Sequence, residues 1–414
     1  MMSSELFLSR IDGRLWAALR EDGSTVEVRV EPLDDVPRAG RILKARVSNV
    51  LSGIQSAFLE IGAERGAYLH AGDLVFPGEP SSPSPIQDRL KEGRELLVQV
   101  EREGRGSKGA RVTCFLTIPG RLLVLLPWGT TRAVSRRIRD RAERDRLQSI
   151  LESLPSEESG WIARTSAAGA DARRLESEAS RLVDQWRELR DGLDGISSPG
   201  LVLREPDLLQ ETLRDSPTVV LERILVDDPV DRERAIEYLR EIDPLTASKV
   251  GLYTEKAPLF ETYGISATID RALRRRVWLK SGGYLVIEET EALVSVDVNT
   301  GKFLGKHDLE QTLLRTNIEA AREIPRQLRL RGLGGIVVVD LIDMREPESR
   351  EEVLSIFCEG LARDPARTRV VGLSDLGLLQ LTRKRTRPGL AEQLTRICGA
   401  CRGRGRVRPE VYDE

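Results

Sequence analysis

Two aspartates that follow apolar segments, Asp297 and Asp340, are the residues best placed to do chemistry in this chain. In "ALVSVDVNTGK" the valines alternate with Ser295, Asp297 and Asn299, so an extended strand would place these three polar side chains on one face. In "GGIVVVDLIDM" four residues that favour strands run directly into Asp340. The pattern predicts two strands, each with an aspartate near its carboxyl end.

The segment between the two aspartates is expected to be a helix that brings them together. Apolar residues recur at positions 309, 313, 314, 318, 321, 324 and 328, which is helical spacing, with Asp308 as the cap and Gly332 as the end. Carboxylates without histidine or cysteine are preferred ligands of Mg²⁺ and Mn²⁺, and Mg²⁺ held in this way usually meets a phosphate. The pair therefore indicates phosphodiester or phosphoryl chemistry. The alternative, that each aspartate only caps the turn or helix after it, stays open on pattern alone.

Composition limits the class of protein without identifying a ligand. The 414 residues are 40% hydrophobic and 31% charged, which is typical of a soluble globular chain of two or more domains. No run of about eighteen apolar residues occurs, and the first residues lack the apolar core of a secretory signal, so we expect a cytoplasmic protein without a membrane span. The net charge of −2 does not indicate nucleic acid. With only His70 and His307, a Ser–His or two-histidine zinc mechanism is disfavoured.

The order of predicted elements is that of a multidomain α+β chain. Residues 5–30 alternate in polarity and turn at Asp12-Gly13 and Asp22-Gly23, which is typical of β-hairpins. From Gly40 the same alternation predicts a small antiparallel barrel. Residues 121–190 alternate strand and helix patterns and predict a small α/β unit. Strand patterns at 284–289, 293–299, 334–343 and 369–374 follow, with helices between the later ones.

The segment "CGACRGRGRV" places Cys398 and Cys401 three positions apart, which is half of a tetrahedral zinc site. Only thirteen residues follow Cys401, and none is cysteine or histidine. The pair could be half of a shared metal site, a redox pair, or neither. A redox pair is disfavoured, because the flanking sequence lacks the strand and helix that place such a motif.

Several long segments resemble the ribonuclease E/G family. They are "TEALVSVDVNTGKFLGK", "LEQTLLRTNIEAAREIPRQLRLRGLGGIVVVDLIDM", "LTRKRTRPGL", "YTEKAPLFETYGI" and "RRRVWLKSGGYLVIEETEAL". The motif N-T-G-x-F at residues 299–303, which follows Asp297, favours the ribonuclease G branch. The resemblance covers about residues 36–407. It implies an Mg²⁺-dependent endoribonuclease of single-stranded, A/U-rich RNA that prefers a 5′-monophosphate end and takes part in rRNA processing and mRNA decay.

The resemblance also implies the fold and its boundaries. Residues 1–35 and 206–270 would form an RNase H-like fold, 36–119 an S1 (OB) RNA-binding barrel and 120–205 a 5′-sensor. Residues 271–391 would form a DNase I-like catalytic domain and 392–407 a zinc-link.

The resemblance also assigns the family's site residues to the matching positions of this sequence. Asp297 and Asp340 match the carboxylates that hold the catalytic Mg²⁺, for which Mn²⁺ could substitute, and Asn299 matches the residue that orients Asp297. Metal-activated water would then attack the phosphorus in line. The RNA-contacting positions of the barrel match Phe58, Tyr68 and Lys108. Without the resemblance, Phe58 is interpreted as a core residue.

The implied 5′-sensor reads the terminal monophosphate with a guanidinium fork and a hydroxyl, which match Arg164 and Thr165. Supporting positions match Gly120, Val124, Arg136, Arg137 and Arg367. For Arg136 and Arg137 the alternative is that they form only the solvated start of a helix.

The resemblance implies that Cys398 and Cys401 bind a single Zn²⁺ together with the same two cysteines of a second copy, which gives a homodimer. Cys114 and Cys358 stand in apolar contexts and are expected in the core.

This chain departs from the family at several points. Pro325 inside the predicted helix should kink it or remove one backbone bond, and Gly399 replaces a usual proline. The chain stops where relatives continue into a small C-terminal domain, and it has no scaffold tail, so degradosome assembly is not expected. The competing hypothesis is a non-catalytic S1-type RNA-binding regulator, against which Asp297, Asn299 and Asp340 argue.

Overall fold

The computed structural model describes residues 3–32, 38–76, 84–104, 109–155, 159–204, 206–216, 221–301, 309–374, 376–403 and 405–407. The chain divides into two compact units. One comprises Met1–Pro32, Val220–Glu233 and Lys249–Glu414, and the other comprises Leu33–Val219 and Arg234–Ser248. Helix α5 (Pro229–Ile242) contains residues of both. No helix of the described ranges is long and apolar enough to cross a membrane.

A five-stranded sheet of the first unit begins with the predicted hairpins. Its order is β15 (Val250–Leu252), β14 (Leu221–Val226), β1 (Ser4–Ile11), β2 (Arg14–Glu21) and β3 (Ser24–Val30). Asp12, Gly13, Asp22 and Gly23 all have positive φ, between 47° and 76°, as tight two-residue hairpins require. The predicted turns are confirmed. Helices α7 (Leu259–Thr262), α8 (Ile265–Ala272) and α11 (Leu390–Leu394) contribute to the core against this sheet.

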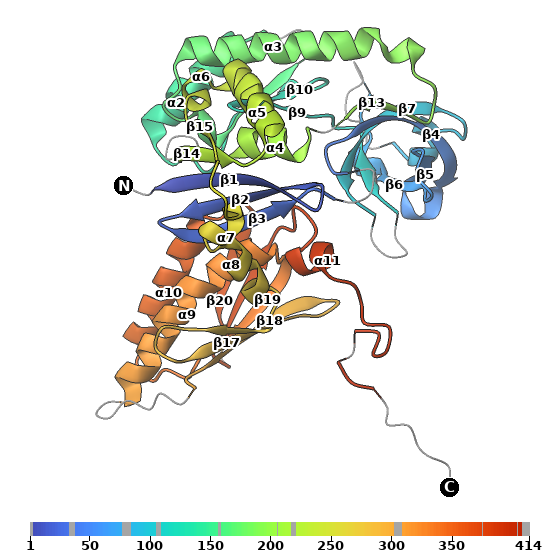
Figure 1. The fold of residues 1–414 in the computed structure, drawn as a ribbon. Helices are drawn as coiled ribbons and strands as arrows, with labels where there is room; N and C mark the ends of the chain where they lie inside the picture. The colour runs from blue at the N-terminus through green and yellow to red at the C-terminus, as the bar shows by residue number, and fades with distance from the viewer. Residues whose placement is uncertain are drawn as a thin grey trace. The chain divides into compact units, whose positions relative to one another are not determined.

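A six-stranded sheet of the same unit carries both aspartates. Its order is β16 (Arg276–Trp278), β17 (Tyr284–Glu289), β18 (Leu293–Asn299), β19 (Gly335–Asp340), β21 (Leu378–Arg383) and β20 (Thr368–Leu373). Figure 1 shows helices α9 (Leu309–Arg331) and α10 (Pro347–Ala362) packed together beside it, and their apolar side chains share a core with one sheet face. Strand β21, which the sequence patterns did not predict, lies between β19 and β20.

The predicted crossover helix is confirmed as α9, which ends before Gly332 at a φ of +67°. The predicted cap, Asp308, lies outside the described residues. Pro325 sits inside the helix without breaking it, although its nitrogen has no proton to donate. The Pro325 ring packs against Gly360 of α10, where an added Cβ would lie 2.9 Å from Pro325 Cγ. The glycine therefore allows the two helices to approach closely.

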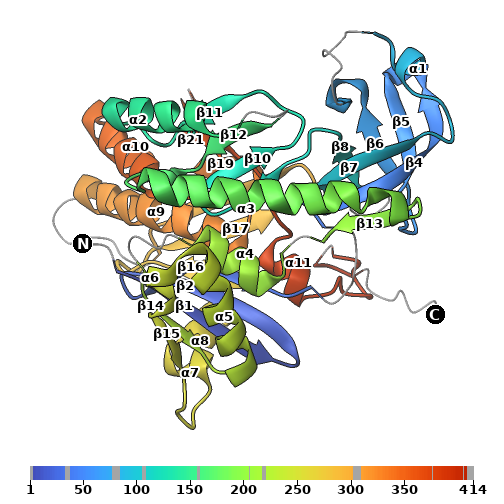
Figure 2. The same ribbon diagram turned by 90° about the horizontal axis from the view of Figure 1, so that it is seen from above.

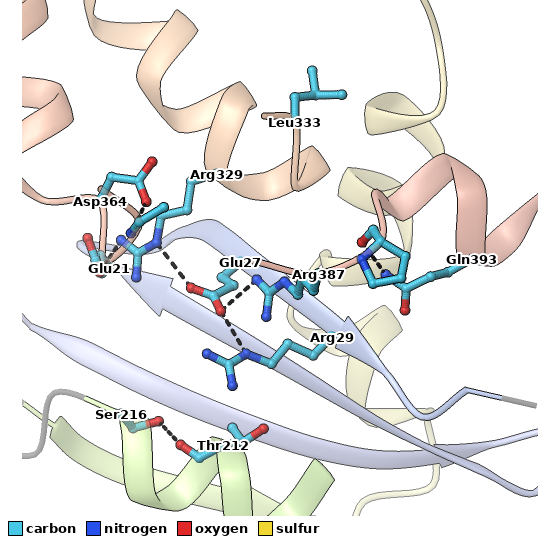
Figure 3. Close-up of polar contacts among 12 residues, drawn as sticks. Glu21, Glu27, Arg29, Thr212, Ser216, Arg329, Leu333, Asp364, Arg387 and Gln393 are labelled. Atoms are coloured by element: carbon cyan, nitrogen blue, oxygen red, sulfur yellow. Dashed lines mark hydrogen bonds and ion pairs between the residues drawn. The ribbon is translucent and has the colours of Figure 1, made fainter. Parts of the chain in front are cut away.

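A buried ionic cluster ties α9 to the hairpin sheet within this unit. Glu27 of β3 accepts from Arg29 at 2.7 Å, from Arg329 of α9 at 3.2 Å and from Arg387 at 2.7 Å. Figure 3 shows these three arginines converging on the one carboxylate. Burial raises the pKa of Glu27, but the three guanidinium groups outweigh it and hold the pKa well below the usual value.

The predicted barrel is confirmed in the second unit. Strands β4 (Ile42–Leu51), β5 (Ser56–Glu60), β6 (Ala67–His70), β8 (Arg111–Thr113) and β7 (Glu95–Arg102) are neighbours in this order, and pairing of β7 with β4 closes the ring. Strand β13 (Gly200–Leu203) adds to β4, and the short α1 (Ile86–Arg89) packs on the barrel core through Ile86.

The α/β unit predicted for residues 121–190 is confirmed within the second unit. A four-stranded sheet runs in the order β11 (Arg132–Val134), β12 (Gly160–Ala163), β10 (Leu123–Leu126) and β9 (Ile118–Pro119). Helices α2 (Arg141–Ser153) and α3 (Ala172–Asp191) bury Trp161 and Leu123 against it, and Figure 2 shows the long α3 lying along these strands. Helices α4 (Leu208–Asp215) and α6 (Pro244–Ala247) also belong to the second unit. The RNase H-like and DNase I-like assignments and the five domain boundaries stay predictions.

Candidate functional site

The structure brings Asp297 and Asp340 together on neighbouring strands. Strands β18 and β19 are parallel, and the two aspartates are Cα partners in the register. Neighbouring strands lie about 4.8 Å apart, and residues in register on a parallel pair point to the same side. Both aspartates are exposed, whereas Val296, Val298 and Val339 beside them are buried under the helices. The two carboxylates therefore share the uncovered face of the sheet.

The environment of the two carboxylates suits a divalent cation. No arginine or lysine forms an ion pair with either one among the described residues. Neither accepts a backbone N–H there, so the described part of the chain does not support the capping interpretation. Asn299 Nδ2 donates to Asp297 Oδ2 at 2.7 Å, as expected of a residue that orients this carboxylate. Two unpaired carboxylates side by side are a donor set suited to Mg²⁺ or Mn²⁺.

The backbone around the pair is fixed by two features that sequence reasoning missed. Asn317 of α9 is fully buried, and its amide donates to the Ile342 carbonyl at 2.7 Å and accepts the Ile342 N–H at 3.1 Å. This holds the chain two residues after Asp340. The sequence did contain a signal for this role, because Asn317 is a polar residue on the apolar face of the predicted helix. On the other side, a Cβ at Gly301 would lie 2.4 Å from the Gly282 carbonyl, so two glycine segments pack together after Asn299.

The barrel places two of its predicted contact residues side by side. Phe58 on β5 and Tyr68 on β6 are cross-strand partners with ring centroids 6.3 Å apart, in an edge-on arrangement. Phe58 is 41% exposed, so its interpretation as a core residue is wrong; its position on the pleat faces away from buried Ala57 and Leu59. Tyr68 is half-buried, and its hydroxyl is 2.6 Å from Ser56 Oγ. Lys108 lies outside the described residues.

The predicted sensor pair, Arg164 and Thr165, follows β12 directly. Arg164 donates to the Gly120 carbonyl and, at 2.7 Å, to the Asp215 carboxylate. Thr165 Oγ1 lies 3.0 Å from Ser135 Oγ. Burial raises the pKa of Asp215, but Arg214 and Arg164 outweigh it and hold the pKa far below the usual value. Asp215, which sequence reasoning missed, is thus a charged partner that fixes the Arg164 guanidinium.

The supporting sensor residues divide between the two units. Gly120 has a backbone role, since an added Cβ would lie 2.0 Å from Glu178 Oε1. Val124 is half-buried on β10 opposite Ile162. Arg136 and Arg137 are exposed before α2, in the loop after β11. Arg367 is exposed before β20 and belongs to the first unit, whereas the other sensor residues belong to the second.

The cysteine pair forms a tight turn. Cys398 is exposed and Cys401 half-buried, and the Arg402 N–H donates to the Cys398 carbonyl at 2.8 Å. Backbone N–H groups of Cys401 and Ala400 lower the pKa of Cys398, which favours the thiolate that Zn²⁺ requires. No group of three or more His, Cys, Asp and Glu suited to a metal occurs among the described residues.

The other two cysteines differ from each other. Cys114 is buried as predicted, and burial raises its pKa to about 11. The prediction for Cys358 is wrong: it is exposed on α10, because Val353, Phe357 and Leu361 form the buried face of that helix.

Comparison with known proteins gives a consistent result. The model of the Ribonuclease E/G family matches residues 117–386. Ribonuclease G of Haemophilus influenzae is 39% identical over 416 residues, covering 99% of this chain and 85% of that protein. Ribonuclease G of Escherichia coli K12 is 38% identical over 415 residues, covering 98% and 85%. Ribonuclease E of Haemophilus influenzae is 36% identical over 406 residues, covering 95% of this chain and 43% of that protein.

Proposed function

Because this chain belongs to the ribonuclease E/G family, as its motifs predicted, we propose that it is an endoribonuclease of RNA processing and decay that hydrolyses phosphodiester bonds in single-stranded RNA. The observation that carries the proposal is the register of Asp297 with Asp340 on an uncovered sheet face, with Asn299 bonded to Asp297. Neither carboxylate has a cationic partner among the described residues.

Asp297 and Asp340 would hold Mg²⁺, or Mn²⁺, through carboxylate oxygens. When bound, the ion supplies an activated water and neutralises charge that develops at the phosphate. Asn299 keeps one oxygen of Asp297 fixed, so the carboxylate needs little reorganisation on binding. The Asn317 bonds fix the chain beyond Asp340 in the same way.

The barrel supports binding of single-stranded RNA. Phe58 and Tyr68 present an aromatic pair, and base stacking on such rings is how OB-type barrels hold single strands of little sequence preference. Lys108 would add a phosphate contact by family resemblance. A preference for A/U-rich segments belongs to the same part of the proposal.

A preference for 5′-monophosphate ends rests on Arg164 and Thr165. A guanidinium fork and a hydroxyl suit a terminal phosphate, and Asp215 fixes the fork in place. Cys398 and Cys401 would bind Zn²⁺ together with the same pair of a second copy, which gives a homodimer.

The test is Mg²⁺-dependent cleavage of a 5′-monophosphorylated, A/U-rich oligonucleotide. The wild-type protein should cut it, and Asp340→Asn should abolish cutting while RNA binding stays within about twofold, since the barrel is unchanged. Asp343→Asn, an exposed aspartate outside the strand, is the matched control and should cut normally. Cutting by Asp340→Asn at the wild-type rate refutes the assignment. RNA binding without any turnover by the wild type supports instead a non-catalytic RNA-binding regulator.

A further inference from the structure

An exposed tryptophan stands on the edge strand of the catalytic sheet. Trp278 on β16 is 65% exposed, although apolar side chains of this size are usually well buried. Its ring lies 5.3 Å from that of Tyr284 on β17, in an edge-on arrangement. The Arg276 guanidinium lies 4.4 Å from the Tyr284 ring centroid and 5.7 Å from that of Trp278. We refer to Arg276, Trp278 and Tyr284 as the aromatic platform.

The aromatic platform shares the sheet face of the two aspartates. Trp278 pairs with Tyr284, and Tyr284 pairs with Asn299, so these three lie in one row across β16, β17 and β18. The next row on the same face consists of four cross-strand partners on β16, β17, β18 and β19, namely Arg276, Val286, Asp297 and Asp340. Two strand spacings separate Trp278 from Asn299, which is roughly 10 Å. A nucleotide next to the one held at the aspartates could therefore reach the platform.

A basic groove of about 1040 Å³ borders the platform at the edge strand: Arg276 and Trp278 line it together with residues of α9, a helix that covers the opposite face of the sheet. Seven arginine and lysine residues and two glutamates line it, so the lining side chains carry a net formal charge of +5. One glutamate, Glu323, is paired with Arg326, whereas Arg274, Lys280 and Arg322 have no ion-pair partner among the described residues. Unpaired cations in a groove are an electrostatic match for a phosphate backbone.

We propose that the aromatic platform stacks a base of the RNA substrate close to the bond that is cut, and that the basic groove binds the phosphates beyond it. The inference rests on the proposed endoribonuclease activity and adds a substrate-positioning site to it. An aromatic side chain that covers no core, a cation over its partner ring and a row shared with Asn299 all favour a nucleic-acid strand over a protein partner.

The experiment compares Trp278→Ala and Trp278→Phe with the wild type on one single-site, 5′-monophosphorylated oligonucleotide. One stacked base contributes about 1–3 kcal/mol, so Trp278→Ala should lower kcat/KM and RNA affinity by about 5- to 150-fold. Trp278→Phe should retain most of both, because its ring can still stack. Affinity is measured by fluorescence anisotropy in Asp340→Asn, which prevents cutting. Val371→Ala, 68% exposed on β20 of the same sheet, is the matched control and should change neither quantity.

An abasic scan gives the position. Replacing each nucleotide in turn by an abasic one should remove the penalty of Trp278→Ala at one position near the cut and at no other. For the groove, Arg274→Ala and Arg322→Ala should each flatten the salt dependence of RNA affinity by about 0.7 in log–log slope. Arg141→Ala, 96% exposed on α2, is the charge control.

The outcomes separate this inference from the function on which it rests. Wild-type cleavage that persists unchanged in Trp278→Ala, with unchanged affinity, overturns the platform and leaves the endoribonuclease intact. An equal penalty at every abasic position also overturns it, because the tryptophan would then act on the fold rather than on one base. Absence of cleavage by the wild type overturns the proposed function itself.

Discussion

Asn299 allows the metal site to be tested without removing a ligand. Its Nδ2 donates to Asp297 Oδ2 at 2.7 Å, the only side-chain hydrogen bond of Asp297 in the described part of the chain. A hydrogen bond to a charged group contributes about 1.5–3 kcal/mol. Because Asp297 is exposed, the lower end applies, and it corresponds to about tenfold in an equilibrium constant. Residues that orient a metal ligand typically contribute about 10- to 100-fold to metal affinity or activity, which agrees.

For Asn299→Ala we therefore expect the half-saturating Mg²⁺ concentration to rise about tenfold. Turnover at saturating Mg²⁺ should stay near wild type, because both carboxylates remain. The assay is the initial rate of cleavage of one 5′-monophosphorylated oligonucleotide over a Mg²⁺ series. Ser295→Ala, on the same strand face two residues earlier, is the matched control and should leave the Mg²⁺ dependence unchanged.

Two results would refute this reasoning. A wild-type Mg²⁺ dependence in Asn299→Ala would mean that the hydrogen bond does not prepare Asp297 for the ion. Turnover that saturating Mg²⁺ fails to restore would mean that Asn299 acts on the RNA or on the reaction instead. Thermal unfolding distinguishes both from misfolding: the midpoint should move by no more than about 3–6 °C, since about 1.5 kcal/mol of stability is at stake.

Three further predictions concern other parts of the chain. Asp215→Asn removes the carboxylate that fixes Arg164, so the ratio of kcat/KM for 5′-monophosphate over 5′-hydroxyl RNA should fall about tenfold; an unchanged ratio would contradict the sensor geometry. Glu27→Gln removes the buried negative charge that Arg29, Arg329 and Arg387 share, and should lower the free energy of unfolding at pH 7 by about 3–5 kcal/mol. Because the folded-state pKa of Glu27 is lowered, its contribution is complete above the unfolded value of about 4.3 and is lost as the pH falls toward the folded value, so urea midpoints of the two proteins should converge in acid. Removing zinc with a chelator, or Cys398→Ala, should convert a dimer to a monomer by mass measurement, and a dimer that survives both would exclude the zinc-link.

The meeting of Asp297 and Asp340 was predictable from sequence because it depends on local signals. A helix between two strands makes a crossover, and a crossover joins parallel strands whose carboxyl ends lie at the same edge. Strands β18 and β19 are the only parallel pair among the described strands of their sheet. Had they been antiparallel, the two aspartates would lie at opposite edges.

Long-range pairings were not predictable from the same patterns. Strand β21 enters the sheet between β19 and β20, so the strand beside Asp340 comes from later in the chain. The partner of Arg164, Asp215, is 51 residues away at the end of α4, and no pattern in the sequence connects the two. Trp278 was not singled out at all, because a tryptophan beside strand patterns is most simply expected in the core.

Helix α9 shows how these local and distant features combine. Asn317 in its middle holds the chain after Asp340, and Arg329 near its end binds the buried Glu27. Pro325 lies between them and removes a backbone N–H from the helix, which by itself favours a break at this point. Gly360 lets α10 pack directly on the Pro325 ring, and the helix continues through it. Since a break would separate the Asn317 bonds from the Arg329 anchor, we infer that close packing of α9 and α10 keeps a proline-containing crossover rigid enough to hold Asp340 in register with Asp297.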